Sequence, residues 1–106
     1  MDVLSLFRLD GEVAVVTGAG TGIGRGIALG LASAGADVVV AGRRPDKIEA
    51  VAAEIRATGR RAIAVPTDVM VDAEVQNLVD RTVAEFGKLD IWVNNAGYYP
   101  MAPALE

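Results

Sequence analysis

The chain has 106 residues, of which 52% are apolar and only 5% aromatic, so it holds one domain at most, with a core of small aliphatic side chains. This apolar content excludes a disordered chain. The net charge of −4 disfavours nucleic acid as the main partner, because phosphate backbones attract basic surfaces. The chain has no cysteine and no histidine, which excludes disulfides and removes the commonest metal ligands. We therefore predict no metal site.

The first ten residues carry Asp2, Arg8 and Asp10 and lack the basic start and continuous apolar stretch of a signal peptide. Purely apolar runs such as residues 38–41 are far too short to cross a bilayer. These features predict a soluble, cytoplasmic protein that has no membrane partner.

The first predicted elements are a strand, a helix and a second strand. The β-branched run Val13–Thr17 predicts the first strand. Residues 37–41 contain three consecutive valines and predict a strand that is apolar on both faces. Between them, residues 22–34 predict a helix that ends before a left-handed Gly35, with a buried stripe of Ile23, Ile27, Ala28 and Leu31.

Two further helices and two further strands follow. Pro45 suits the first position of a helix that Gly59 ends, with a buried stripe of Ile48, Val51, Ala52 and Ile55. Residues 61–66 predict a third strand, and residues 89–94 predict a fourth, in which we expect Trp92 to pack under a helix. Asp72 is expected to cap the last helix, which Gly87 ends and whose stripe is Val75, Leu78, Val79, Thr82, Val83 and Phe86.

Doubly apolar strands that alternate with helices indicate parallel βαβ units with right-handed crossovers. The predicted fold class is α/β, a Rossmann-like doubly wound parallel sheet of which this chain holds the first half. Residues 1–106 would be the N-terminal, dinucleotide-binding part of a single domain, without its catalytic half. Because the fourth strand would then be an apolar edge, we expect a piece of a longer chain, or the ordered part of one.

A glycine-dense turn joins the first predicted strand to the first predicted helix. Its spacing is Gly18-x-x-x-Gly22-x-Gly24 rather than the common Gly-x-Gly-x-x-Gly. Gly18 would make the tight exit from the strand, Gly22 would let a pyrophosphate approach the backbone, and Gly24 would let helix and strand pack closely. Free amides around residues 21–23 and the helix dipole would meet the negative charge. The alternative is a glycine-rich turn that binds no ligand.

Three motifs resemble the short-chain dehydrogenase/reductase family. Residues 17–24 resemble its cofactor motif Thr-Gly-x-x-x-Gly-x-Gly, Asp68-Val69 resembles its adenine-side Asp-Val, and Asn94-Asn95-Ala96-Gly97 resembles its Asn-Asn-Ala-Gly. Their order and spacing match over almost the entire chain. The general likeness is to the group of 3-oxoacyl-carrier-protein reductases and of gluconate and sugar-alcohol dehydrogenases.

The resemblance implies an NAD(P)-dependent oxidoreductase that moves hydride between the nicotinamide and a small-molecule carbonyl or secondary alcohol. It also implies a homo-oligomer, often a tetramer. A nucleotide-binding module without turnover and a fragment that binds nothing remain the alternatives.

The end of the second strand bears on the choice of cofactor. In a dinucleotide fold an acidic residue there holds the 2′-hydroxyl of the adenine ribose. Here Gly42 takes that place, and Arg43 and Arg44 follow. A guanidinium offers a fork of donors to a 2′-phosphate, so the sequence favours NADP over NAD. The alternative is that both arginines are solvated loop charges.

Asp68 would accept the exocyclic amine of adenine, or it would be a turn residue before the last helix. Asn94 and Asn95 would tie the fourth strand to neighbouring backbone, or one of them would contact the ribose, and the resemblance implies both. The predicted cofactor-binding residues are Gly18, Gly20, Thr21, Gly22, Ile23, Gly24, Arg43, Arg44, Asp68, Val69, Asn95, Ala96 and Gly97.

Members of the family place a Ser and a Tyr-x-x-x-Lys pair in their second half, where the Tyr exchanges a proton with the substrate. The only tyrosines here, Tyr98 and Tyr99, have no lysine four residues on. No catalytic residue is therefore predicted. Tyr98, Tyr99 and Met101 would begin a substrate-side loop, or they would form an exposed aromatic loop end.

Overall fold

A computed structural model describes residues 8–95 of the chain. The described part holds a four-stranded sheet of order β3-β2-β1-β4, in which every neighbouring pair is parallel. Its elements in chain order are β1 (Val13–Thr17), α1 (Gly22–Ser33), β2 (Asp37–Gly42), α2 (Pro45–Arg56), β3 (Ala62–Pro66), α3 (Asp72–Phe86) and β4 (Ile91–Val93).

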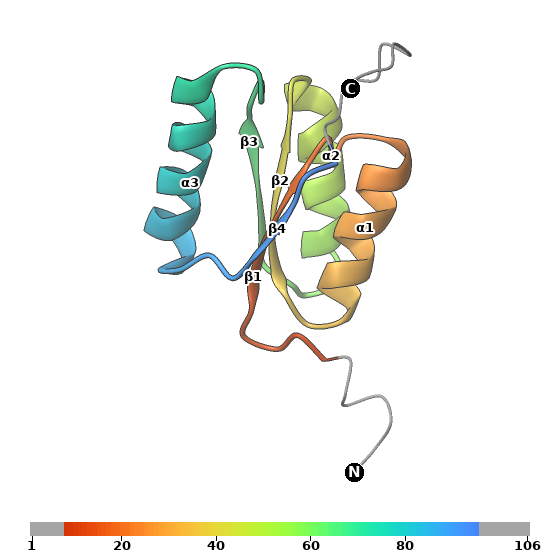
Figure 1. Cartoon of the computed structure of the whole chain (residues 1–106). Coiled ribbons are helices and arrows are strands. Elements are labelled where there is room, and N and C mark those ends of the chain that lie inside the picture. The colour runs from red at the N-terminus through yellow and green to blue at the C-terminus, as the bar shows by residue number, and fades with distance from the viewer. Residues whose placement is uncertain (1–7, 96–106) are drawn as a thin grey trace, which may run out of the picture.

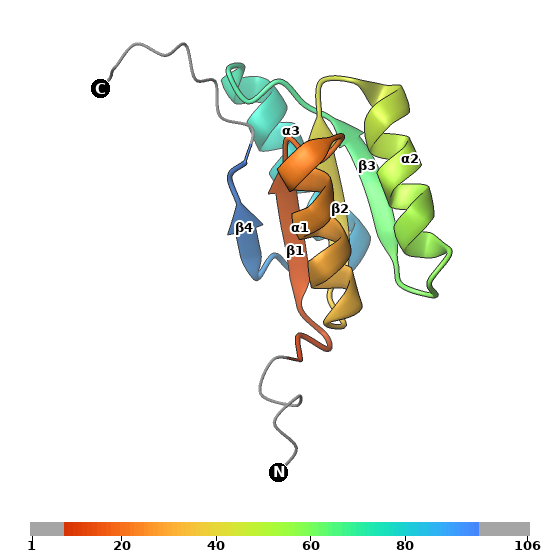
Figure 2. The ribbon, with the colours of Figure 1, turned by 90° about the vertical axis from the view of Figure 1, so that its right-hand side faces the viewer.

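The sheet lies between two layers of helices: α1 and α2 cover one face and α3 covers the other (Figure 1). In Figure 2 the strands point up, α1 and α2 lie in front, and the chain moves to the right from β1 to β2 to β3, so these crossovers are right-handed. α3 then carries the chain behind the sheet to β4, on the other side of β1. The predicted Rossmann-like first half is thereby confirmed. Within residues 8–95 no helix has the length and apolar character that crossing a membrane requires.

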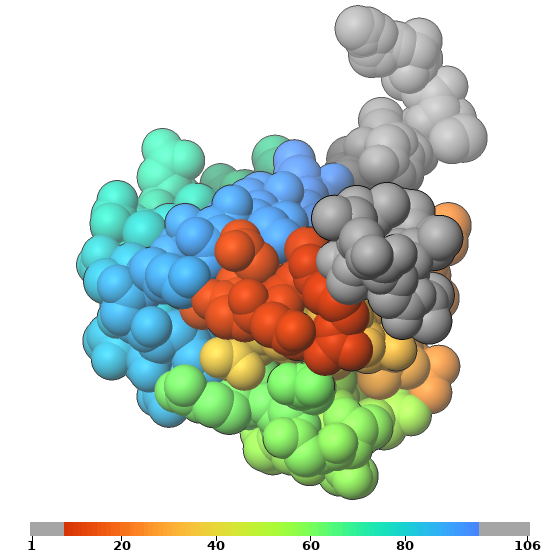
Figure 3. Space-filling model, turned by 90° about the horizontal axis from the view of Figure 1, so that it is seen from below, coloured from red at the N-terminus to blue at the C-terminus, as the bar shows by residue number. Residues whose placement is uncertain are grey.

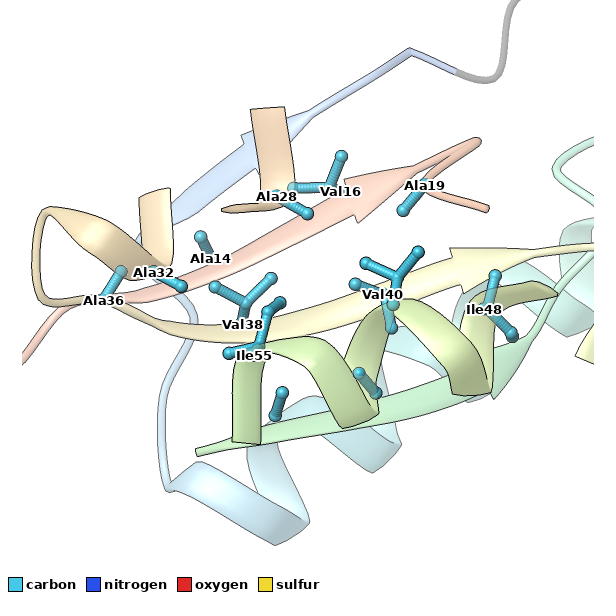
Figure 4. Close-up of a cluster of buried hydrophobic side chains, with 13 residues drawn as sticks. Ala14, Val16, Ala19, Ala28, Ala32, Ala36, Val38, Val40, Ile48 and Ile55 are labelled. Atoms are coloured by element: carbon cyan, nitrogen blue, oxygen red, sulfur yellow. The ribbon is translucent and has the colours of Figure 1, made fainter. Parts of the chain in front are cut away.

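The larger hydrophobic core lies between the sheet and helices α1 and α2 (Figure 4). Alternate residues of β1 and β2 face it, and the small Ala28 and Ala32 let α1 come close to them. On the other face, the buried residues that pack with Leu78 of α3 are Val15, Val39, Ala41 and Val65. β1 is therefore buried on both faces, and so is the interior of β2.

The structure corrects three predicted side-chain positions. Ile23 is 76% exposed, because the buried stripe of α1 runs through Gly24, Ala28 and Ala32 and Ile23 lies on its flank in the first turn. Val83 is 45% exposed, one residue beyond the buried Thr82. Trp92 is 38% exposed on the edge strand β4, since the buried residues that pack with Leu78 of α3 come from β1, β2 and β3.

The start of α3 also differs from the prediction. Its N-cap is Val71, so Asp72 is the first helical residue and makes no cap. Instead, Glu74 of the first turn accepts a hydrogen bond of 2.8 Å from the amide of Asp68. The Glu74 carboxylate, in the first turn of α3, thus accepts a hydrogen bond from a backbone amide that precedes the helix.

β4 is shorter than predicted, because a side chain pairs with β1 where the strand would begin. The amide of Val13 donates to Oδ2 of Asp90 at 2.8 Å, and the amide of Asp90 donates to the carbonyl of Val13 at 2.9 Å. Seen from below, the segments that lead into β1, β3 and β4 are visible at this end of the molecule (Figure 3).

Candidate cofactor-binding site

The glycine turn between β1 and α1 has a backbone that only glycine adopts readily. Gly18 and Gly22 have φ angles of +62° and +60°. At Gly24 the requirement is one of space, since a β-carbon there would lie 1.9 Å from the carbonyl oxygen of Gly18. The amide of Ala19 donates to the carbonyl of Ala41 at 3.0 Å, which anchors the turn to the end of β2.

The amino end of α1 carries no side chain that would neutralise its positive dipole. Its N-cap, Thr21, makes no side-chain capping bond, and the first turn has no acidic residue. By contrast, the first turn of α2 contains Asp46 and that of α3 contains Asp72 and Glu74. Because the first amides of a helix have no intrahelical acceptor, the start of α1 suits an anion.

The turn lies at the same end of the sheet as the loop between β2 and α2, at the top of Figure 1. A pocket of about 310 Å³ opens between them, lined by Gly18, Gly20, Thr21, Gly42, Arg43, Arg44, Lys47 and Ile48. Three of these side chains are cationic. Within residues 8–95, none of the three has a carboxylate oxygen within 4.0 Å.

Asn95 links the end of β4 to the glycine turn. Its amide donates to Oγ1 of Thr17 at 2.9 Å, and its Nδ2 donates to the carbonyl of Gly18 at 3.3 Å. A β-carbon at position 24 would also come within 2.6 Å of that Nδ2. Two motifs that lie far apart in the sequence therefore meet, in the geometry expected of residues that tie β4 to neighbouring backbone.

Thr17 is the centre of the junction between the end of β1 and the end of β4, which Asn94 and Asn95 complete. Its buried hydroxyl lies 3.3 Å from the carbonyl oxygen of Val93 and 3.2 Å from Oδ1 of Asn94, either of which accepts its proton. The same hydroxyl accepts the amide of Asn95. The last residue of β1 thus positions the start of the turn and the end of β4 together.

The sequence model of the short chain dehydrogenase family matches residues 12–106. This chain belongs to that family. The resemblance that three motifs predicted is confirmed.

Among its curated relatives, 2-dehydro-3-deoxy-D-gluconate 5-dehydrogenase of Escherichia coli K12 is 46% identical over 106 residues, which is 98% of this chain and 40% of that one. The 7alpha-hydroxysteroid dehydrogenase of the same strain is 46% identical over 90 residues, 85% of this chain and 35% of that one. This member of the family thus spans about two fifths of the length of such relatives.

Solved structures of the family superpose closely. A crystal structure of hydroxysteroid dehydrogenase from Escherichia coli gives a TM-score of 0.86 at 44% identity and covers 89% of this chain and 40% of that one. A 7 alpha-hydroxysteroid dehydrogenase complexed with NADH and 7-oxo glycochenodeoxycholic acid gives 0.85 at 41% identity, over 89% of this chain and 37% of that one.

Lys47 is a residue that lines the pocket and that sequence reasoning missed. It is the third residue of α2, and a β-carbon at Gly20 would lie 2.9 Å from its own β-carbon. Gly20 therefore lets the first turn of α2 approach the glycine turn. The available signal was Pro45, which fixes the start of the helix and so places residue 47 in its first turn.

The structure does not bring Asp68 and Val69 into the pocket, although both are half-buried. Oδ1 of Asp68 accepts the amide of Met70 at 2.9 Å, which is the turn contact that the sequence left as an alternative. The other predicted residues, Ala96 and Gly97, lie outside the described residues, as do Tyr98, Tyr99 and Met101.

Proposed function

We propose that this protein binds NADP and exchanges hydride between the nicotinamide and a carbonyl or secondary alcohol of a small molecule. The observation that carries the proposal is the pocket beside the glycine turn, whose three cations lack a carboxylate partner within residues 8–95. The close approach of Gly24 to the Gly18 carbonyl supports it as well, because this packing leaves a bare backbone at the start of α1.

The pyrophosphate is assigned to the glycine turn. Its positive φ angles leave the backbone uncovered, and the start of α1 adds its dipole. The residues proposed to hold this group are Gly18, Gly20, Thr21, Gly22, Ile23 and Gly24.

The preference for NADP rests on residues 42–47. Gly42 offers no carboxylate to the adenine ribose, and Arg43, Arg44 and Lys47 all line the pocket that would receive a 2′-phosphate. One relative of known structure is complexed with NADH, so membership of the family does not by itself select the cofactor. Three cations around one pocket favour NADP, which is the more highly charged of the two cofactors.

Further contacts belong to the same proposal. Asp68 and Val69 are assigned to the adenine, and Asn95, Ala96 and Gly97 to the ribose side. A bound nicotinamide supplies the hydride. Because these 106 residues contain no Tyr-x-x-x-Lys pair, proton transfer is assigned to residues outside this sequence.

We also propose that residues 1–106 are the N-terminal part of one Rossmann domain. The complete protein is proposed to be a cytoplasmic homo-oligomer, a tetramer by its family. Equilibrium sedimentation of the full chain tests the assembly, and a monomer at micromolar concentration would refute it.

The cofactor is tested by titrating the full chain with NADPH and NADH while nicotinamide fluorescence is followed. Arg43→Ala should weaken NADPH binding by about tenfold to a hundredfold, since a charge-assisted hydrogen bond is lost, and should leave NADH nearly unchanged. Arg81→Ala removes the same charge from α3, on the other face of the sheet, and should alter neither affinity. Equal weakening of both cofactors by Arg43→Ala would refute the NADP preference, and no signal at millimolar cofactor would refute binding.

A further inference from the structure

Gly42 ends β2 at the place where dinucleotide-binding folds carry their acidic residue. Its φ angle lies outside the left-handed region, so its backbone would accept any residue. Space is what excludes a side chain, because a β-carbon at position 42 would lie 2.9 Å from Cγ2 of Ile48. A side chain at position 42 would therefore force Ile48 or the strand to shift, and glycine is favoured there by its neighbour rather than by its own conformation.

Ile48 has little freedom to move aside. It is 1% exposed in the first half of α2 and belongs to the larger hydrophobic core, where Figure 4 places it beside β2. A β-branched side chain in a helix keeps essentially one χ1 rotamer, so the Cγ2 methyl stays where it is. The helix turn itself is constrained, since Lys47 packs against Gly20 with equally little room.

We propose that Ile48 is a positioning residue for cofactor specificity, acting through position 42. Its Cγ2 methyl occupies the space that an aspartate at 42 would need, and so keeps a carboxylate away from the adenine ribose. Among the residues that line the pocket, this leaves Arg43, Arg44 and Lys47 as the charged ones. The proposal rests on the proposed function, in that the pocket is taken to receive the 2′ substituent of the ribose.

Residues 42 and 48 then form a coupled pair. Gly42→Asp alone adds the acid that suits NAD but forces it against the Ile48 methyl. Gly42→Asp combined with Ile48→Ala supplies both the acid and the space. A change of cofactor preference should therefore need both substitutions.

The experiment introduces Gly42→Asp into the full chain alone, with Ile48→Ala and with Ile48→Val. Ile48→Val is the matched control, because valine keeps both branches at the β-carbon while it also loses volume. The melting temperature without cofactor and the dissociation constants of NADH and NADPH are measured for these variants and for the single Ile48 variants.

We expect Gly42→Asp to lower the melting temperature in the unchanged and Ile48→Val backgrounds and to lower it much less in the Ile48→Ala background. Gly42→Asp/Ile48→Ala should bind NADH at least tenfold more tightly than Gly42→Asp alone, with NADPH binding weakened in both. A purely structural role of Ile48 would not move this ratio of NADH to NADPH affinity.

Two results would overturn the inference while the proposed function stands. One is that the melting-temperature shifts of Gly42→Asp and Ile48→Ala simply add in the double variant, and the other is that Gly42→Asp shows the same ratio of NADH to NADPH affinity in all three backgrounds. If the unchanged protein binds neither cofactor, the proposed function fails, and the role of Ile48 in cofactor specificity fails with it. In that case the melting temperatures still decide whether residues 42 and 48 are coupled. Should Gly42→Asp aggregate, Gly42→Ala adds the β-carbon alone and tests the same coupling in the same backgrounds.

Discussion

The two ends of the sheet differ in how many of their cations are paired with carboxylates. At the amino end, where the strands begin, Arg61 lies 3.7 Å from Asp37 and Lys88 lies 3.0 Å from Asp90, while Arg60 has no carboxylate oxygen within 4.0 Å among residues 8–95. At the carboxyl end, three cations have no such partner within residues 8–95: Arg43, Arg44 and Lys47. Charges that the fold pairs internally support the fold, whereas charges left without a partner remain available to an anion from outside.

The backbone follows the same division. The amino end uses Asp90 to complete its hydrogen bonding with Val13. The carboxyl end instead has a glycine turn with two positive φ angles and an uncapped helix start. A carboxylate completes the backbone hydrogen bonding at the amino end, whereas the first amides of α1 are presented outward at the carboxyl end, so substitutions at the two ends should have different consequences.

The largest effect is expected at the tightest contact of the carboxyl end. Gly24→Ala places a β-carbon against the Gly18 carbonyl, so the turn must open; we expect a loss of about 3 kcal/mol in the free energy of unfolding and loss of dinucleotide binding. Gly26→Ala, in the same helix, meets no atom within 4 Å and should raise stability by about 0.5–1 kcal/mol. Urea denaturation measures the free energy of unfolding of both variants. Similar values would show that the contact between position 24 and the Gly18 carbonyl does not constrain the turn.

The junction beneath the turn should show the next largest effect. Thr17→Val keeps the β-branched shape but leaves the Asn95 amide without its acceptor, at a cost of about 1–3 kcal/mol. Thr82→Val is the control: it removes an equally buried hydroxyl that only donates to the carbonyl of Leu78, four residues back in α3. Thr17→Ser, which retains the hydroxyl, should restore part of the loss. Equal losses for Thr17→Val and Thr82→Val in urea would show that the junction has no special role.

The pH dependence of stability should differ between substitutions at the two ends, because a carboxylate at the amino end, Asp90, takes part in the folded structure. The hydrogen bond from the Val13 amide, and then Lys88, hold the pKa of Asp90 below its ordinary value. Because the folded pKa is the lower one, Asp90 stabilises the fold above its unfolded pKa of about 3.9, and this is lost as the pH falls through the folded value.

The Asp90→Asn variant makes this visible in thermal melts. The unchanged protein should melt higher than Asp90→Asn at neutral pH, and the difference should shrink below about pH 4. The gap between the unchanged protein and Arg43→Gln should show no such dependence, since Arg43 has no carboxylate partner in the described part of the chain. A constant gap for Asp90→Asn down to pH 2 would contradict the assigned role of Asp90.

Local sequence patterns predicted the elements well, because each pattern is set by residues close together in the chain. The β-branched run gave both bounds of β1, and Pro45 gave the start of α2. The contacts of the site depend on residues that are distant in sequence, such as Asn95 with Thr17, and no periodicity encodes them.

The misplaced side chains have a related cause. Helical periodicity gives the angle of a side chain around the helix but not which part of the helix lies over the sheet. The periodicity therefore predicts a buried Ile23, whereas the side chain is exposed in the first turn of α1. Lys47 and Ile48 were missed as pocket residues because their importance comes from the glycines opposite them, at positions 20 and 42. A glycine seen only in the sequence does not reveal which side chain occupies the space it leaves.

The smallest expected effect is also the most direct test of the difference between the ends. Without cofactor, Arg43→Gln should change the free energy of unfolding by no more than about 0.5 kcal/mol, because no described carboxylate loses a partner. Arg61→Gln should lower the melting temperature, since this side chain pairs with Asp37 and lies 4.6 Å from the ring centroid of Phe86. Raising the salt concentration should weaken the effect of Arg61→Gln and leave that of Arg43→Gln nearly unchanged. If Arg43→Gln destabilised the protein as much as Arg61→Gln does, Arg43 would have a structural partner, and the proposed preference for NADP would lose the cation on which it most depends.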